Sequence, residues 1–319
     1  MIKAKSIVKG AASNFIPRFR HSGTGTDGAF SAEGAYAIFM RYLLALSRAG
    51  TSFADKTVVE FGPGSSFGVG IAALLAGARR YYAFDLIDHT DDERNLVIFD
   101  VILRMFQTRA PVPIGGWCAR IFPLIDDPAF PADLLPDALL AKTLDPDRVS
   151  LIRRDLASKG GLYIRPRSSA NIASAKLDEP ADVIISESVL EHVDDLKPTY
   201  ETFARWLTPD GVMAHLIDYG SHNLSDDWNG HWTCSPKTWS LVRGKRAYLI
   251  NRVPHHGHLK LLADTGMEVV HSQLLRRVDG ALIEEFSPEF RSMDPRDATT
   301  ALASVVCRRA SPASASRTQ

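Results

Sequence analysis

The strongest structural signal in the chain is the stretch Val58-Val-Glu-Phe-Gly-Pro-Gly-Ser-Ser-Phe-Gly68. Its β-branched beginning, residues 56–61, predicts a buried strand, and the glycines after it predict a tight turn. Small apolar residues over 66–76 then predict a helix that packs closely on a sheet, and residues 80–85 predict a second strand. Strand, turn, helix and strand in this order form a βαβ unit, which predicts a parallel sheet.

Similar patterns recur along the rest of the chain. Helices are predicted over residues 31–50, where Ser31 is the expected N-cap, and over 189–206 and 255–264, with a turn at 209–211. The last two strands come late and close such a sheet in antiparallel fashion. We therefore expect an α/β fold, doubly wound around a mostly parallel seven-stranded sheet, with a helical insertion after the second strand. The predicted strands are 56–61, 80–85, 161–164, 181–186, 212–218, 267–275 and 301–307.

The chain is expected to form one main domain over residues 31–309, preceded by a flexible leader (1–30) and followed by a disordered tail (310–319). Residues 90–160 interrupt the alternation of strands and helices. We expect this insertion to form a cap over the edge of the sheet at which a ligand binds. Its two helical stretches, separated by a proline-rich piece, are 92–107 and 146–157.

Composition limits the partners and the location. Lys plus Arg equals Asp plus Glu, 37 against 37, so a net charge of zero provides no overall attraction to nucleic acid or anionic lipid. The 3 cysteines show no Cys-x-x-Cys spacing, which argues against a zinc site or disulfide framework and fits a reducing compartment. No segment has the roughly 20 apolar residues of a membrane span, and the N-terminus has no secretory signal pattern. We expect a cytoplasmic protein without a nucleic-acid partner or integral membrane contact.

The glycine turn predicts a ligand site, because glycines let the backbone approach a ligand and the following helix offers free N–H groups. The glycines are 62, 64 and 68, so the third lies one residue later than in the dinucleotide pattern Gly-x-Gly-x-x-Gly. Glu60 precedes the turn by two residues. A carboxylate there would repel a pyrophosphate and would attract a ligand with a cationic amino group. The alternative is a tight turn that only packs the helix on the strand.

A second acid, Asp85, ends the next predicted strand. It follows Glu60 by 25 residues, close to the roughly 20 expected for the acid that accepts hydrogen bonds from ribose hydroxyls. Asp88 is a nearby alternative, and a solvated loop aspartate is the non-functional interpretation.

Four motifs in order resemble the class I S-adenosylmethionine-dependent methyltransferase family, in particular its small-molecule branch. They are Glu60-x-Gly-x-Gly, Asp85, Ala181-Asp-Val-Ile-Ile-Ser-Glu-Ser-Val-Leu-Glu-His192 and Leu207-Thr-Pro-Asp-Gly211. The resemblance implies a Rossmann-like fold and S-adenosyl-L-methionine as the cofactor.

By the same resemblance, Glu60, Gly62, Pro63 and Gly64 belong to the loop that lines the methionine moiety. Asp85 is expected to hold the ribose, and Ser186 and Glu187 to border the point of methyl transfer. The list of these cofactor-binding residues is Glu60, Gly62, Pro63, Gly64, Asp85, Ser186 and Glu187. Pro63 replaces the usual small residue, and no acid between 165 and 177 matches the one that contacts adenine in the family, so Asn171 is the nearest polar candidate.

Methyl transfer mainly needs positioning of the nucleophile and exclusion of water, and an oxygen or nitrogen nucleophile can also need a base. We expect His222 or Asp218 to be that base, because both follow the fifth predicted strand. His192 is a third candidate, and a packing role for it is an equal alternative. The run His255-His-Gly-His258 has no acidic partner at ligand spacing, so we expect no metal site.

The function expected is therefore S-adenosylmethionine-dependent methyl transfer to an oxygen or nitrogen of a small molecule, such as a sugar or a secondary metabolite. A loop rich in His and Trp after the fifth predicted strand favours a small acceptor. One alternative is a non-catalytic S-adenosylmethionine-binding scaffold. Another is an NAD-dependent oxidoreductase, which Glu60 and the glycine spacing disfavour. The oligomeric state is left open.

Overall fold

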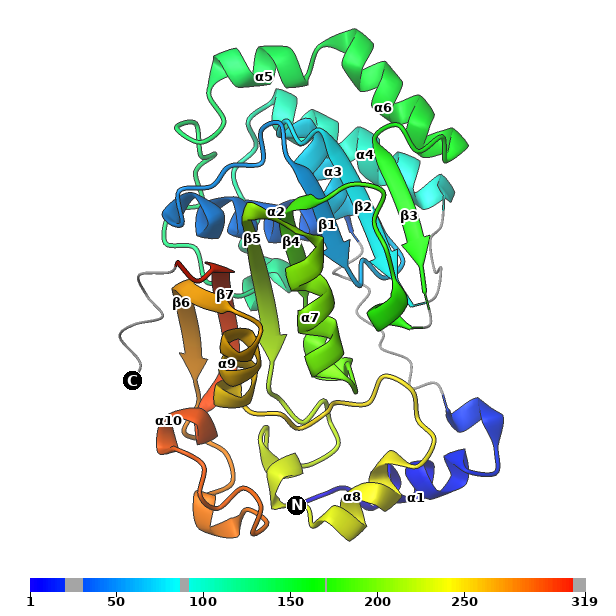
Figure 1. The fold of residues 1–319 in the computed structure, drawn as a ribbon, viewed down its shortest axis with the longest axis vertical. Coiled ribbons are helices and arrows are strands. Elements are labelled where there is room, and N and C mark those ends of the chain that lie inside the picture. Colours follow the sequence, from blue (N-terminus) through cyan, green and yellow to red (C-terminus); the bar gives the residue numbers. More distant parts are fainter. Residues whose placement is uncertain (21–30, 87–91, 170, 312–319) are drawn as a thin grey trace.

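A computed structural model describes residues 1–20, 31–86, 92–169 and 171–311 of the chain. Within these residues, seven strands form one sheet in the order β3-β2-β1-β4-β5-β7-β6 (Figure 1). The first five strands pair in parallel, and β7 is antiparallel to both β5 and β6. The strands are β1 (Thr57–Phe61), β2 (Arg80–Asp85), β3 (Ile164–Ser168), β4 (Ala181–Glu187), β5 (Leu207–Asp218), β6 (Met267–Arg276) and β7 (Thr300–Arg309).

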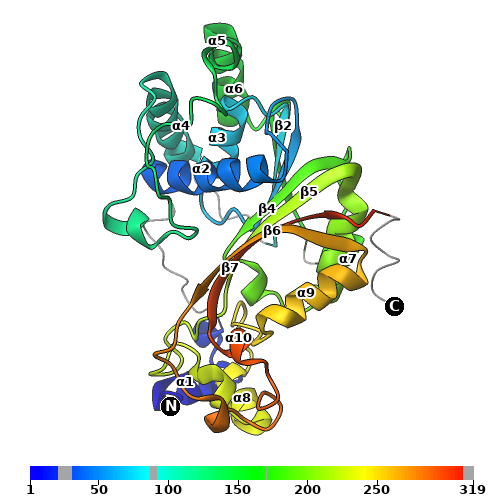
Figure 2. The ribbon, with the colours of Figure 1, turned by 90° about the vertical axis from the view of Figure 1, so that its left-hand side faces the viewer.

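Helices cover both faces of the sheet, as the doubly wound prediction requires (Figure 2). Successive side chains of β1 point to opposite faces, so Val58 packs in the core under α2, α3 and α4 while Val59 packs in the core under α7 and α9. The helices are α1 (Ala4–Ser13), α2 (Ala32–Arg48), α3 (Gly68–Leu75), α4 (Asp92–Gln107), α5 (Asp137–Thr143), α6 (Pro146–Ser158), α7 (Leu196–Trp206), α8 (Pro236–Arg243), α9 (His255–Asp264) and α10 (Pro295–Ala298).

The strand order reverses beside β1, which pairs with β2 on one side and with β4 on the other. In register, Glu60 of β1 lies between Ala83 of β2 and Ile185 of β4. The connections from β1 and β4 leave toward opposite faces of the sheet, so a crevice opens at the carboxyl ends of these strands. This edge is where the predicted ligand residues meet.

Several predicted boundaries shift for identifiable reasons. The third strand begins at Ile164 rather than ending there, because the Asp155 carboxylate accepts from the backbone N–H groups of Leu162 and Tyr163, each at 2.8 Å, and holds them in a turn. The single helix predicted over 189–206 is wrong. A 3₁₀ turn (Leu190–His192) is separate from α7, and the Asn251 amide donates to the carbonyls around the break. The predicted turn at 209–211 lies within β5.

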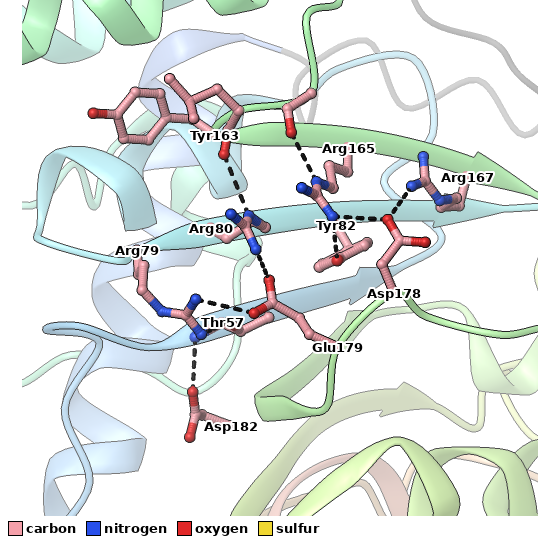
Figure 3. A network of polar contacts seen from close by, with 12 residues as sticks. Thr57, Arg79, Arg80, Tyr82, Tyr163, Arg165, Arg167, Asp178, Glu179 and Asp182 are labelled. Atoms are coloured by element: carbon pink, nitrogen blue, oxygen red, sulfur yellow. Dashed lines mark hydrogen bonds and ion pairs between the residues drawn. The ribbon is translucent and has the colours of Figure 1, made fainter.

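A polar network attaches the segment before β4 to the face of β2 and β3 (Figure 3). Asp178 accepts hydrogen bonds at 2.7 Å and 2.5 Å, and Glu179 forms two further ion pairs. Each half-exposed pair of this kind contributes about 0–1 kcal/mol, so the network mainly fixes the path of the chain. The four arginines involved are Arg79, Arg80, Arg165 and Arg167.

The helical insertion after β2 is present as α4, α5 and α6, but the prediction that it caps the ligand edge is wrong for α5 and α6. These helices lie at the opposite end of the sheet from α1 and α8 (Figure 1). Arg148 of α6 donates to the carbonyls of Leu74, in the last turn of α3, and of Ala78, just before β2. The C-terminal end of α3 thus anchors the insertion at the amino ends of the strands.

The leader prediction also needs correction, because residues 1–20 are not a flexible segment. Helix α1 packs on α8, where Gly10 lies directly against the carbonyls of Leu241 and Val242. The backbone N–H of Lys3 donates to Leu224 at 2.9 Å, far along the chain. Residues 21–30 of the expected leader, and residues 312–319 of the expected tail, lie outside the described residues. Among the helices that the structure describes, none combines the length and apolar character needed to cross a bilayer.

We predict that Gly70→Ala destabilises the fold. A Cβ at Gly70 of α3 would overlap the ring of Tyr81 on β2, and such overpacking costs about 1–3 kcal/mol even where alanine favours the helix. The free energy of unfolding, measured by denaturant titration, should fall by that amount. Gly115→Ala is the matched control, because a Cβ there meets nothing within 4 Å and the residue has φ −100°. Equal stability of the two variants would contradict the packing described.

Candidate functional site

A cavity of about 1100 Å³ opens at the carboxyl ends of β1, β2, β4 and β5. Its walls include all but one of the residues predicted to bind the cofactor or act as a base: Glu60, Gly62, Pro63, Gly64, Asp85, Glu187, His192, Asp218 and His222. Residues far apart in the sequence thus meet at one sheet edge, because parallel strands end on the same side.

The turn after β1 supplies a bare backbone wall. Gly62 has φ 78° and Gly64 has φ 66°, both in the left-handed region that favours glycine. A Cβ at Gly62 would lie 2.5 Å from the side chain of Val189, so that position has no room for another residue. The missing side chain at Gly62 thus lets the turn pack closely against Val189 at the edge of the cavity.

Glu60 is a buried carboxylate on this wall. The Tyr81 hydroxyl donates to its Oε2 at 2.5 Å. Burial raises the pKa of Glu60 to about 7, the bond from Tyr81 opposes the rise, and the charge of Asp85 adds to it. The side chain therefore lies beside the cavity and not within the apolar interior, and it takes up charge easily when a cation approaches.

Asp85 stands at the same bend. Its Oδ2 accepts from the Gly64 amide at 3.3 Å and its Oδ1 accepts from the Leu86 amide at 2.7 Å. These two bonds join the end of β2 to the glycine turn and orient the carboxylate along the cavity wall. The alternative residue Asp88 lies outside the described residues.

Glu187 at the end of β4 faces the cavity, and Ser186 does not. The Tyr42 hydroxyl of α2 donates to Glu187 Oε2 at 2.8 Å. Burial raises the pKa of Glu187 to about 8, against the lowering effects of Tyr42 and Arg41. The prediction that Ser186 contacts the cofactor is corrected, because neighbouring side chains of a strand point to opposite faces. Its Oγ lies 2.8 Å from His215 Nδ1 on the α7 side.

The three predicted base residues form a second wall. Nε2 of His222 lies 3.2 Å from Oδ2 of Asp218, and the rings of His192 and His222 meet edge to face with centroids 4.9 Å apart. Burial and then the charge of His222 lower the pKa of His192 to about 4. Burial alone would raise the pKa of Asp218, but hydrogen bonding to His222 and its positive charge hold it below its ordinary value. The turn places His222 with φ 47° and Asn223 with φ 63°.

Two other sequence candidates have local structural roles. Asn171 accepts from the Ala173 amide at 3.0 Å as the cap of a 3₁₀ turn and is not part of the cavity wall. In the histidine run, Nδ1 of His255 lies 3.0 Å from the Tyr219 hydroxyl and Nδ1 of His258 lies 2.9 Å from the Tyr200 hydroxyl. These buried tyrosine contacts explain both histidines as packing residues.

The sequence alone did not reveal a basic wall contributed by the N-terminal segment. Lys5 and Lys9 of α1 and Arg18 reach the cavity, together with Arg120 and Arg246. The spacing of Lys5 and Lys9, four residues apart on one helix face, was a usable signal. Within the described residues of the 90–160 insertion, the stretch that reaches the cavity is 117–122, through Trp117, Arg120, Ile121 and Phe122.

One further grouping was not predicted. Glu191, His192 and His222 place potential ligand atoms within 4.8 Å of one another. Glu191 is buried, and it belongs to the same motif as Ser186 and Glu187, although no role is predicted for it. The expectation of no metal site comes from the cysteines and from residues 255–258, and His222 is too far from Glu191 and His192 in the sequence for a standard ligand spacing to reveal this group.

Comparison with known families gives one decisive match. The model of the methyltransferase domain family matches residues 35–272. No curated protein sequence matches the chain.

Many solved structures resemble the fold at low sequence identity. An S-adenosylmethionine-dependent methyltransferase from Mesorhizobium loti has 17% identity and a TM-score of 0.42, with 89% of this chain and 100% of that chain covered. Magnesium protoporphyrin IX methyltransferase from Synechocystis has 13% identity and a TM-score of 0.42, with 96% and 99% covered. A Clostridium acetobutylicum methyltransferase has 9% identity and a TM-score of 0.40, with 87% and 92% covered.

We predict that Gly64→Val abolishes or strongly weakens S-adenosylmethionine binding. A β-branched residue at φ 66° is strained and fills space beside the cavity wall. Gly266→Val is the matched control, because it has φ 76° and open surroundings in the turn between α9 and β6. Calorimetry should show a loss of at least about tenfold, or ~1.4 kcal/mol, for the first variant only. Normal binding by Gly64→Val would show that the site lies elsewhere.

Proposed function

The chain belongs to the methyltransferase domain family, and from that premise we propose that it transfers a methyl group to an oxygen or nitrogen of a small-molecule acceptor. Membership makes the chain an enzyme of the class I S-adenosylmethionine-dependent type, with that molecule as methyl donor. It also selects against the NAD-dependent oxidoreductase that the glycine turn alone left open. The acceptor class and the roles of individual residues are the parts we propose.

The observation that carries the proposal is the charge pattern around the glycine turn. Glu60, Asp85 and Glu187 all line the end of the cavity nearest the turn. Burial disfavours the charged forms of Glu60 and Glu187, so a cationic ligand is favoured beside them. These carboxylates match the positive charges of the methionine amino group and the sulfonium, and Asp85 can accept hydrogen bonds from the ribose hydroxyls. The left-handed backbone at Gly62 and Gly64 lets the turn border the cavity.

When bound, S-adenosylmethionine supplies an electrophilic methyl group on an excellent leaving group. The residues of the chain then have to hold the acceptor in line and keep water away. Helix α1 and residues 248–250 contribute to the walls of the cavity and cover it in part. This partial cover reduces the access of water to the acceptor space.

The acceptor faces the wall of His192, Asp218 and His222. The contact between Asp218 and His222 fixes how the His222 ring is turned, so the wall presents a defined polar surface to the nucleophile. The basic side chains from α1 border the same space, and the covered cavity suits a small molecule better than a polymer. A hydroxyl of a sugar or a secondary metabolite fits these features.

The central experiment combines binding with turnover. Purified protein is titrated with S-adenosylmethionine, S-adenosylhomocysteine and NAD, and then incubated with donor and a broad metabolite extract. We expect binding of the first two ligands and release of S-adenosylhomocysteine with small-molecule acceptors. Binding without turnover on any acceptor would instead support the scaffold alternative. Binding of NAD alone would overturn the proposal.

We predict that S-adenosylmethionine binds more tightly as the pH rises from about 6 to about 7, below the roughly 7.7–8.0 at which an α-amino group titrates. Glu60 has its pKa raised to about 7, so it is mostly neutral at the lower pH and about half ionised at the higher pH. A cation prefers the ionised form, so affinity increases with pH over this window.

Glu60→Gln should bind the donor more weakly and show a smaller pH dependence in the same titrations. Glu33→Gln is the control, because Glu33 is an exposed acid at the start of α2 and lies outside the cavity wall. Affinity that is constant or decreases over this pH range in the unmodified protein would contradict the role given to Glu60.

A further inference from the structure

Glu191 has an unusual environment for an acidic side chain. It is 3% exposed, and within the described residues neither Oε1 nor Oε2 has a partner with good hydrogen-bond geometry; only the backbone N–H groups of Glu191 itself and of Asp218 approach the carboxylate. A buried carboxylate without a donor or a cation is costly, and such groups in proteins are normally paired or coordinate a metal. The position therefore lacks a positive partner.

Two histidine side chains lie close enough to Glu191 to bind the same cation. Potential ligand atoms of Glu191, His192 and His222 lie within 4.8 Å of one another. Nδ1 of His192 is also buried without a hydrogen-bond partner in the described part of the chain. Two separate side chains thus leave lone pairs unused at one point.

We propose that Glu191, His192 and His222 bind one divalent transition-metal ion at the acceptor wall of the cavity. One carboxylate and two imidazoles form a donor set found for Zn²⁺ in catalytic sites and for other first-row transition ions. Mg²⁺ and Ca²⁺ prefer sites made only of oxygen atoms, so they fit less well. Three protein ligands leave coordination positions for water or for a ligand.

The surroundings hold the three side chains in place. Asp218 contacts Nε2 of His222 at 3.2 Å, and carboxylates commonly orient metal-ligating histidines in this way. The Asn251 amide donates at 2.8 Å to the carbonyls of Leu190 and Val193, which flank Glu191 and His192. The left-handed backbone at His222, with φ 47°, is a strained conformation of the kind that persists where a side chain must be aimed.

The ion would act on the acceptor, a step that rests on the proposed function. His192 and His222 both line the cavity, so the remaining coordination positions border the acceptor space. A divalent ion there would bind an acceptor hydroxyl and lower its pKa, so that the hydroxyl could lose its proton to water at the open side of the cavity. The oxygen would then form a bond to the methyl carbon while the carbon–sulfur bond breaks and S-adenosylhomocysteine leaves. The two histidines then serve as ligands, and the ion replaces the free imidazole base expected from the sequence.

The test measures binding of the metal alone. Full-length protein, first treated with a chelator, is titrated with Zn²⁺, Mn²⁺ and Mg²⁺ by calorimetry, and bound Mn²⁺ is followed by electron paramagnetic resonance. We expect one site for Zn²⁺ and Mn²⁺ and weaker binding of Mg²⁺. Glu191→Gln and His222→Ala should each weaken binding by at least about tenfold, in line with metal-site losses of 10–100-fold.

His271→Ala on β6 is the control, because His271 lies outside the cavity wall, and it should leave binding unchanged. The site is refuted if the unmodified protein binds neither ion, or if both site variants bind as well as the control. Circular dichroism of each variant shows whether it is folded. If Glu191→Gln is unfolded, the result for His222→Ala decides the test.

The metal titration contains neither methyl donor nor acceptor, so its outcome is independent of the donor titration that tests the proposed function. Donor binding without metal binding would overturn the metal site alone. Metal binding without donor binding would overturn the proposed function and leave the site in place.

Discussion

The site depends on carboxylates that the fold holds at the edge of the sheet without an adequate positive partner. Glu60 and Glu187 end neighbouring strands, and each is fixed by one tyrosine, Tyr81 or Tyr42. Burial raises the pKa of both, because the charged form loses its hydration and a hydroxyl compensates only in part. A ligand that brings positive charge relieves this cost, so these carboxylates favour a cation. Glu191 extends the principle one turn beyond β4, where two histidines offer a metal ion its other ligands.

The cover of the cavity has an origin different from the one expected. The insertion after β2 looks like a cap in sequence, because it is long and interrupts the regular order of elements. Its helices α5 and α6 instead pack at the amino ends of the strands, where Arg148 holds the carbonyls that precede β2. The N-terminal helix α1 takes the covering position because Gly10 allows it to approach α8 closely. This arrangement joins the first residues of the chain to a segment more than two hundred positions later, and brings lysines to the acceptor space.

The sequence predicts which residues meet at the glycine turn, and it predicts the opposite wall of the cavity only in part. Glu60, Gly62, Gly64 and Asp85 lie within one βαβ unit, whose short connections make their meeting nearly unavoidable. Ser186 was misplaced because a one-residue choice in a strand decides which face a side chain takes, and the apolar pattern of a strand buried on both faces does not show it. Asp218, His192 and His222 were candidates for one base, and the structure brings them together with Glu191 as a group.

By itself the sequence determined the fold class, the strand order of the first unit, and the chemistry of the glycine turn. These features depend on local periodicity, on the backbone freedom of glycine and on charges a few residues apart, all of which are written in neighbouring positions. Only the tertiary structure decided what covers the cavity, which face Ser186 takes, and that Glu191 is buried beside two imidazoles. Those outcomes depend on packing between segments that are far apart in the sequence. The neighbours of a side chain set the free energy of burying it or of leaving its carboxylate unpaired, and a local sequence pattern does not predict these neighbours.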